Sequence, residues 1–161
     1  MQDIETIMAD VATTMRTYLP LKMADLCAEK GDTLFGTSVS DGDYTFNSDA
    51  YYVWQMNDLA PYPLAFIQFV DGDPALFSTD NGSDCAKRYT IGIVAIVAEN
   101  AKGTTAIAQT RIGRAIEEVI RERITGRICP AWVVRLRSTT LRDTNDRYYV
   151  TAEVYFTVDI I

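Results

Sequence analysis

The sequence predicts an α+β protein in which a mostly antiparallel sheet carries two helices on one face. Three patterns support this prediction: helical spacing of apolar residues near the N-terminus, the same spacing in residues 104–124, and strict alternation in the closing stretch RYYVTAEVYFTVDII, residues 147–161. The order α, irregular segment, β, β, α, β, β is typical of helices packed against a sheet. With 161 residues, 48% of them apolar, the chain is expected to form a single domain, residues 1–161.

The first element is predicted to be an amphipathic helix. Asp3 is its expected N-cap, and Pro20 is expected to end or kink it, with a second helical piece continuing to Gly31. The polar face is expected to hold Glu5, Thr6, Asp10, Thr13, Thr14 and Thr17. The apolar stripe is Ile4, Ile7, Met8, Val11, Met15, Tyr18 and Leu19.

Residues 31–62 lose this periodicity and mix turn residues with aromatic ones. A disordered linker would be poor in aromatic residues, so we expect an ordered long loop or a short hairpin inserted into the domain. Loops of this kind often carry function. Tyr51, Tyr52 and Trp54 are therefore candidate contact residues.

Two strands are predicted in the middle of the chain. PLAFIQFV, residues 63–70, is expected to enter a turn at DGDP, residues 71–74, and KRYTIGIVAIVAE, residues 87–99, follows as the next strand. Val94 and Ile96 make the second face of that strand partly apolar, which predicts a central strand covered on both sides. Its first face holds Tyr89, Ile91, Ile93, Ala95 and Val97.

The second helix is predicted to begin at Thr104 or Thr105 and to run to about Ile124. Arg123 falls on the apolar side by phase, so the helix is expected to fray there or that side chain to snorkel. The expected buried stripe is Ala108, Ile112, Ala115, Ile116, Val119 and Ile120. The expected opposite face is Arg111, Arg114, Glu117, Glu118, Arg121 and Glu122, with i,i+4 pairs Arg114–Glu118 and Glu117–Arg121.

The last two strands are predicted to form an antiparallel hairpin around the turn RDTND, residues 142–146. The first strand, residues 131–140, is expected to alternate Trp132, Val134 and Leu136 against Val133, Arg135 and Arg137. The closing strand should place Val150, Ala152, Val154, Phe156, Val158 and Ile160 on the core.

The other face of the closing strand holds Tyr149, Thr151, Glu153 and Tyr155. This face is too aromatic for solvent alone and too polar for a second core, and mixed surfaces rich in tyrosine are common at protein contacts. We therefore expect this face, or the free edge of the strand, to meet a neighbouring subunit or to line the inside of a ring.

The sequence gives no pattern for catalysis. It contains no histidine, which excludes Ser–His and Cys–His nucleophiles and histidine-bound metals, and no phosphate-binding GxxxxGK[ST] loop. The acidic segments 41–43, 71–73 and 80–84 lack EF-hand spacing and are interpreted as turns. We therefore predict no catalytic residue, no cofactor and no metal. A small metal- or ligand-binding domain, with Tyr44–Tyr62 as a pocket wall, stays the alternative from another class.

The cysteines and the N-terminus predict a soluble chain made in the cytosol. Cys27, Cys85 and Cys129 form no CxxC pair and are expected to be buried thiols. The acidic start MQDIE does not resemble a signal peptide, and no apolar run reaches the length of a membrane helix. No membrane partner is therefore expected.

The net charge of −7 is unevenly distributed. Residues 1–86 hold 3 basic and 14 acidic side chains, whereas residues 87–161 hold 12 basic and 8 acidic ones. Such an acidic chain is unsuited to coating nucleic acid, while a polarised charge map suits head-to-tail self-association or simply solvated acidic loops. Arg111, Arg114 and Arg121 alternate with glutamates, which indicates an ion-paired surface or a subunit contact.

Together these elements resemble the tail terminator proteins of long-tailed bacteriophages. The resemblance lies in the length and order of the helix Ile4–Leu19, the strands PLAFIQFV and RYTIGIVAIVAE, the helix TTAIAQTRIGRAIEEVIRERI and the closing hairpin, and it leaves out residues 31–62. It implies a structural virion protein that forms a homo-oligomeric ring, usually a hexamer, in the tail and neck.

The same resemblance implies the partners of that ring, which would assemble in the host cytoplasm. The ring would cap the tail tube and join it to the head-side connector, while genomic DNA passes through the lumen without sequence-specific binding. Head-completion, adaptor and tail tube proteins of the same assembly are alternatives with a similar plan. A DNA-binding neck component that uses Arg111, Arg114, Arg135 and Arg137 is a further one.

Overall fold

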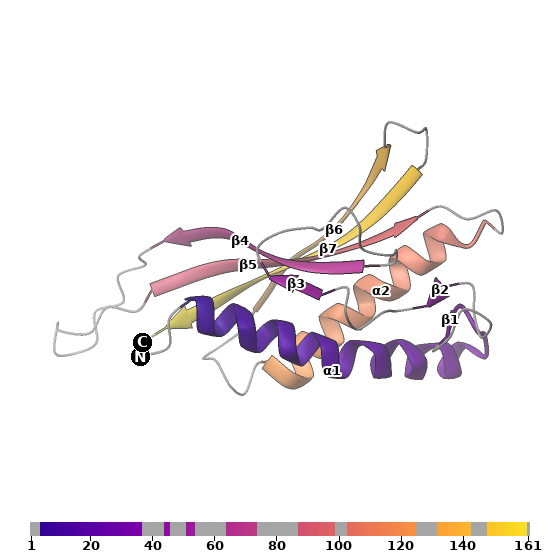
Figure 1. Ribbon diagram of the computed structural model, residues 1–161, viewed down its shortest axis with the longest axis horizontal. Coiled ribbons are helices and arrows are strands. Elements are labelled where there is room, and N and C mark those ends of the chain that lie inside the picture. The colour runs from indigo at the N-terminus through magenta and orange to yellow at the C-terminus, as the bar shows by residue number, and fades with distance from the viewer. Residues whose placement is uncertain are drawn as a thin grey trace, which may run out of the picture.

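The main sheet has five strands in the order β3-β4-β5-β7-β6, and both helices lie on one of its faces (Figure 1). The structure is a computed structural model, and it describes residues 4–36, 44–45, 51–53, 64–73, 87–98, 103–124, 132–142 and 148–160. All strand pairs of this sheet are antiparallel except β3 with β4. The predicted α+β class, with a mostly antiparallel sheet, is confirmed.

Helix α1, Ile4–Lys30, is continuous, and Pro20 lies inside it. The expected end at Pro20 is wrong because the apolar stripe keeps its phase across the proline: Leu19 and Met23 are both buried against the core. Tertiary packing of this kind compensates for the backbone hydrogen bond that proline cannot donate. Thr14, expected on the polar face, is buried, and its hydroxyl donates to the carbonyl of Asp10 at 2.8 Å. The expected cap Asp3 lies outside the described residues.

A glycine turn ends α1. Gly31 has a φ of 70°. The amide of Gly31 donates to the carbonyl of Ala28 at 3.2 Å, and the amide of Asp32 donates to the carbonyl of Cys27 at 3.1 Å. These two bonds form a Schellman motif, for which glycine is favoured because the left-handed conformation costs it no steric strain. The turn directs the chain back towards the core, where Leu34 and Phe35 are buried.

The aromatic segment supplies three short strands. β1, Phe35–Gly36, pairs with β2, Tyr44–Thr45, in parallel, so these two strands do not form a hairpin with each other. β3, Tyr51–Val53, pairs in parallel with β4 at one end of the main sheet. Trp54 lies outside the described residues.

The longer strands are β4, Leu64–Asp73, β5, Lys87–Ala98, β6, Trp132–Arg142, and β7, Tyr148–Ile160. β4 continues through the predicted turn at Asp71-Gly72-Asp73, which pairs with Thr90, Tyr89 and Arg88 of β5. The predicted antiparallel hairpin of β6 and β7 is confirmed. Because β7 lies between β5 and β6, the expected free edge of the closing strand is wrong.

One face of β5 and β7 forms the core with the helices. The pairs Ile91 with Phe156 and Ile93 with Val154 are fully buried on this helix side. They join the side chains of α2, Thr105–Val119, whose predicted buried stripe is confirmed in full: Ala108, Ile112, Ala115, Ile116, Val119 and Ile120. The period-2 and period-3.6 patterns therefore meet in a single apolar cluster.

After Val119 the helix continues as a π-helical turn, Ile120–Ile124, rather than fraying. The wider turn changes the phase of the side chains, so that Ile124 is buried while Arg123 is exposed. The guanidinium carbon of Arg123 lies 4.0 Å from the centre of the Tyr18 ring on α1, a cation–π distance. Arg123, which did not fit the apolar stripe, therefore contacts α1 at the exposed surface of the two helices.

Candidate subunit-contact surfaces

Arg111 does not lie on the exposed face of α2, where it was expected. Its side chain is only 9% exposed, and its Nη1 donates to Oδ1 of Asp32 at 2.5 Å and lies 3.5 Å from Sγ of the buried Cys27. The glycine turn after α1 brings Asp32 to this position, where its Oδ1 also accepts from the amide of Leu34 at 3.3 Å. Arg111 therefore joins the end of α1 to α2 and offers little surface to a neighbouring molecule.

The hydrogen bond between these two side chains moves both pKa values. The bond from Arg111 lowers the pKa of the Asp32 carboxyl, and the same bond raises the pKa of Arg111. A charge-assisted bond of this kind favours the ionised form of each partner. The pair is therefore charged at neutral pH.

Arg114 and Arg121 are also paired with carboxylates of the same chain. Arg114 donates through Nε to Glu118 at 3.0 Å and lies 3.4 Å from Glu29 of α1, and Arg121 donates to Glu117 at 2.8 Å. The two predicted i,i+4 pairs are confirmed. Lys22 of α1 adds a bond of 2.8 Å to Glu122, which raises the pKa of the lysine. Because Arg111, Arg114, Arg121 and Lys22 all have acidic partners, these four side chains are poorly suited to binding phosphate.

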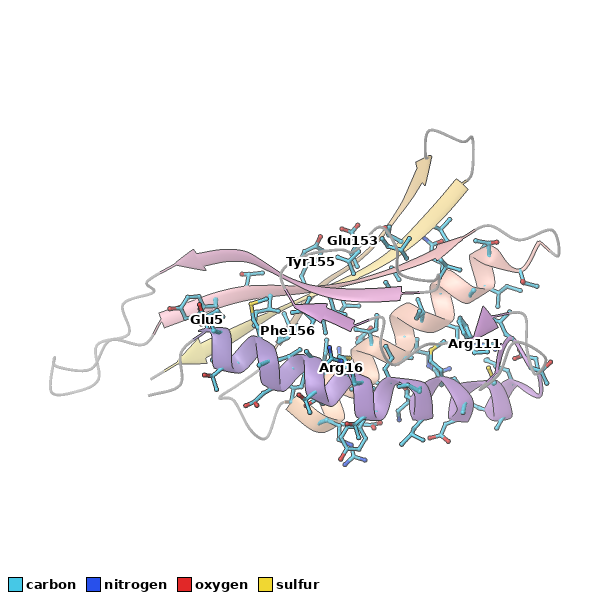
Figure 2. All side chains as sticks on the ribbon, viewed as in Figure 1. Glu5, Arg16, Arg111, Glu153, Tyr155 and Phe156 are labelled. Atoms are coloured by element: carbon cyan, nitrogen blue, oxygen red, sulfur yellow. The ribbon has the colours of Figure 1, made fainter. Side chains whose placement is uncertain are left out.

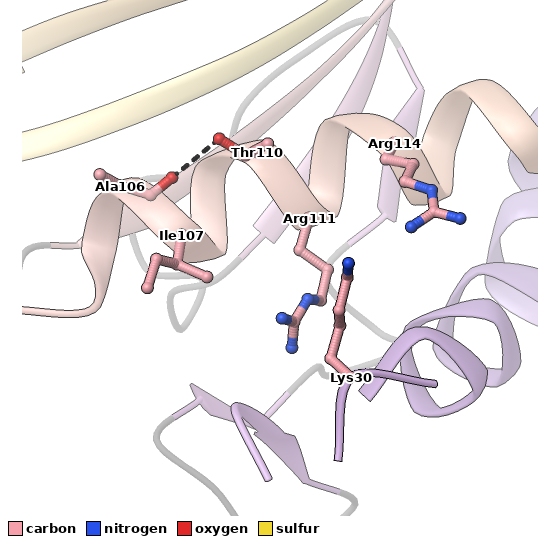
Figure 3. A pocket seen from close by; sticks show the side chains of 6 residues that line it. All are labelled: Lys30, Ala106, Ile107, Thr110, Arg111 and Arg114. Carbon is pink, nitrogen blue, oxygen red and sulfur yellow. Dashed lines mark hydrogen bonds between the residues drawn. The ribbon is translucent and has the colours of Figure 1, made fainter. Parts of the chain in front are cut away.

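A pocket of about 440 Å³ lies between the end of α1 and the first half of α2 (Figure 3). Its described lining is Lys30, Ala106, Ile107, Thr110, Arg111 and Arg114. Sequence reasoning missed this pocket, although one residue pointed to it: Ile107 is apolar but lies outside the stripe, and it is 53% exposed. Two of the three cations in the lining are already bound to carboxylates.

Within the part of the chain that the structure describes, no three Asp, Glu, Cys or His side chains gather as a metal site would require. The described walls of the pocket come from the helices and not from Tyr44–Tyr62, which was the expected wall in the ligand-binding alternative. The pocket therefore lends that alternative no support.

The face of the sheet turned away from the helices, here the far face, carries the predicted contact residues of β7. Figure 2 shows Tyr155 and Glu153 on this face, whereas Phe156 points towards the helices. The Tyr155 hydroxyl donates to Oε1 of Glu153 at 2.7 Å, and Tyr155 is 9% exposed. Thr151 on the same strand is also buried. Glu153 is half-buried, so it is more exposed than Thr151 and Tyr155. Tyr149, the fourth predicted contact residue of this strand, is described only by its place in β7.

The far face of β5 is covered as well. Val94 and Ile96 are 6% and 5% exposed, which confirms the prediction of a central strand buried on both sides. They pair with Glu153 and Thr151 of β7. The far face therefore combines two aliphatic side chains with a tyrosine–glutamate pair.

A bulge in β4 determines which face its two aspartates occupy. Phe69 pairs with Ile91 on the helix side, but the next paired residue, Asp71, is opposite Thr90 on the far face. The extra residue shifts the alternation by one position. Without it, Asp71 and Asp73 would fall on the face that packs against the helices.

A second bulge does the same for the arginines of β6. Val133 pairs with Phe156 on the helix side, but Arg135 pairs with Tyr155 on the far face. The expected face shared by Trp132, Val134 and Leu136 is therefore wrong, because Trp132 pairs with Thr157 and Leu136 with Val154. Arg135 and Arg137 consequently lie at far-face positions of the last strand in the sheet order.

No protein-family model and no curated protein matches the chain. Among solved structures, a chain of the virion of a native gene transfer agent particle is similar, with 15% sequence identity and a TM-score of 0.39. The similarity covers 93% of this chain and 98% of that chain. A TM-score of this size does not establish a shared fold. In the described part of the chain, no helix is both long and apolar enough to cross a bilayer.

Proposed function

We propose that this chain is a structural virion protein of a phage tail and neck, a tail terminator that forms a ring. The observation that carries the proposal is an open sheet with two different ends. The sheet ends in β3, which has three residues, and in β6, which has eleven, while the helices cover one face. A second copy can therefore continue the sheet at either end.

Different ends favour a ring over a two-fold dimer. In a two-fold dimer each copy presents the same surface, whereas a head-to-tail contact joins one end to the other and closes into a ring when the rotation allows it. The five-stranded sheet offers this second kind of contact. Repetition around an axis would also remove the open strand edges that otherwise promote aggregation.

The charges support a structural role in which DNA passes without being held. Arg111, Arg114 and Arg121 are paired with carboxylates inside the chain, and the net charge is −7. A lumen with net negative potential repels phosphates, so a duplex would pass without sticking. The resemblance to tail terminators supplies the rest of the proposal: a hexameric ring between the tail tube and the head-side connector, with no cofactor and no turnover.

The test combines native mass spectrometry with negative-stain imaging of the purified protein and of tail tubes. We expect a ring, with six copies as the proposed number, and additional density at one end of each tube. A protein that polymerises into tubes on its own would instead be a tube protein, and one that binds only the connector would be an adaptor. A strict monomer that leaves tube ends bare would contradict the proposal.

A further inference from the structure

We propose that neighbouring copies in the ring are joined by strand pairing: β6 of one copy adds antiparallel to the second half of β4, Gln68–Asp73, of the next. This inference rests on the proposed ring and names the surfaces that close it. It is carried by strand direction, by the positions of the open edges and by charge.

Strand direction favours this pairing. β4 and β7 run in one direction, and β5 and β6 run in the other, because each adjacent pair in the order β4-β5-β7-β6 is antiparallel. A neighbour that continues the sheet without being inverted therefore presents its β6 antiparallel to β4. Antiparallel pairing is also slightly more stable per residue than parallel pairing.

Among the described strands, both edges have main-chain positions without a strand partner. β3 pairs with β4 only at Ala65, Phe66 and Ile67, which leaves Gln68–Asp73 without an outer partner among the described strands. β6 pairs along one side with β7, and no described strand lies on its other side. An edge with open amide and carbonyl groups readily accepts another strand, with affinity supplied by the main chain.

Charge selects which edges meet. β6 contains Arg135, Arg137 and Arg142 and no acidic residue, whereas β4 contains Asp71 and Asp73 and no basic residue. Two copies of β6 paired by a two-fold axis would place arginines near arginines, and two copies of β4 would place aspartates near aspartates. Like charges on directly opposite positions are destabilising, so only the head-to-tail contact joins opposite charges.

The spacing of these charges also matches. The two bulges put both pairs on the far face, and each pair is separated by one intervening residue, Gly72 or Leu136. In an antiparallel pairing, Arg137 of one copy is then opposite Asp71 of the next when Arg135 is opposite Asp73. Both opposite-charge pairs form in the same register.

This register continues a pattern that already exists within one copy. Asp73, Arg88 and Asp159 form a row across β4, β5 and β7, and Glu153 is opposite Arg137 in the β7–β6 pair. Adding Arg135 of the neighbour next to Asp73 extends the first row with alternating sign. Adding Asp71 of the neighbour next to Arg137 extends the second row in the same way.

The experiment reverses the charge of each edge and then mixes the variants. Asp71→Lys/Asp73→Lys makes both edges of a copy basic, and Arg135→Glu/Arg137→Glu makes both edges acidic. We expect each variant alone to need a protein concentration at least about tenfold higher than the wild type for half-assembly. Mixed in equal amounts, the two variants should form rings again, with an even copy number and equal numbers of each, as native mass spectrometry can count.

A matched control carries the same change in net charge at another surface. Asp10→Lys/Asp25→Lys replaces two exposed aspartates of α1, and we expect its rings to match those of the wild type. If both edge variants form rings as readily as the wild type does, the proposed edge contact is wrong, although the proposed function still stands. A wild type that never forms a ring, with or without tubes, would overturn both.

Arg137 and Asp73 also have oppositely charged neighbours within the copy, so the variants' melting temperatures must be compared with that of the wild type. Hydrogen exchange on the wild-type protein tests the same contact without a variant, so it still decides the question if a variant does not fold. Amide hydrogen exchange in β6 and in Gln68–Asp73 should slow when dilute protein is concentrated into rings. Rings in which neither segment gains protection would overturn the proposal.

Discussion

The helix layer and the ends of the sheet satisfy their charges differently. In the helix layer, Arg111, Arg114 and Arg121 each have an acidic partner in the same chain, and Arg111 is buried although its partner Asp32 is exposed. Towards the two ends of the sheet, β4, next to the end strand β3, carries only acidic charges, and β6, the other end strand, carries only basic ones. A layer whose charges are paired internally stabilises one copy, whereas separated charges of opposite sign can specify how copies join.

The largest expected effect comes from the helix side of β7. Phe156 is fully buried between the sheet and the helices. Phe156→Ala should lower the free energy of unfolding by about 3–5 kcal/mol, because apolar contacts are lost and a cavity remains. Urea denaturation measures this change. Phe156→Leu keeps most of the apolar volume and is the control, with a smaller loss; an equal loss in both variants would contradict the cavity explanation.

The ion pair between buried Arg111 and exposed Asp32 should come next. Asp32→Asn removes the counterion of Arg111, which is 9% exposed, while Asp32 itself is 41% exposed. Removing one partner of a fully buried pair costs about 3–5 kcal/mol, and solvent screening at Asp32 reduces the expected loss to about 2 kcal/mol. Glu29→Gln, at the exposed partner of Arg114, is the matched control and should lose much less, because water screens that pair. Equal losses in both variants would mean that burial does not matter at this site.

The same pair predicts a pH dependence. The folded pKa of Asp32 lies below its unfolded value, so its ionisation stabilises the fold above the unfolded pKa, about 3.9, and this contribution is lost as the pH falls through the folded pKa. The difference in stability between the wild type and Asp32→Asn should therefore be constant near neutral pH and shrink below about pH 4. Urea titrations over this range check the sign, and a difference that grows with acidity would contradict it.

The helical spacing and the strand alternation of apolar residues predicted most of the fold, because many residues of each pattern are buried on the same face. The stripe from Ala108 to Ile120 and the alternation of β5 and β7 both gave the correct buried face. Arg111 was misplaced because its counterion lies 79 residues away in the sequence, and only the folded chain brings the two together. Of the two effects expected of Pro20, an end or a kink, the end does not occur for a related reason, since packing on both sides of the proline holds the helix.

The bulges show a second limit of sequence reasoning. An alternating pattern can be read from either end of a strand, and one extra residue changes the face of every residue beyond it. In β6 this error put Trp132 with Leu136 and hid the grouping of Arg135 and Arg137 with the far face of β7. The charges that support the proposed contact between copies could therefore be found only from the register.

The far face of β7 should respond less than its helix side. Tyr155→Phe removes only the hydroxyl that donates to Glu153 at 2.7 Å, so we expect a loss of about 1 kcal/mol. Glu153→Gln and the double variant complete a cycle that isolates the interaction between the two side chains. Single losses that simply add in the double variant would show that this bond contributes nothing.

The smallest effect should come from the outer surface of the helices. Arg121 is 63% exposed and bonds Glu117 at 2.8 Å, nearly the length of the Tyr155–Glu153 bond. Arg121→Ala should nevertheless cost under about 0.5 kcal/mol, because water and salt screen an exposed pair and ordering two long side chains costs entropy. Urea denaturation at low and high salt should show this small difference vanish at high salt. The Arg121–Glu117 and Tyr155–Glu153 bonds have similar lengths, so we attribute their different contributions to stability to burial and screening. A loss from Arg121→Ala that persisted at high salt would contradict this explanation.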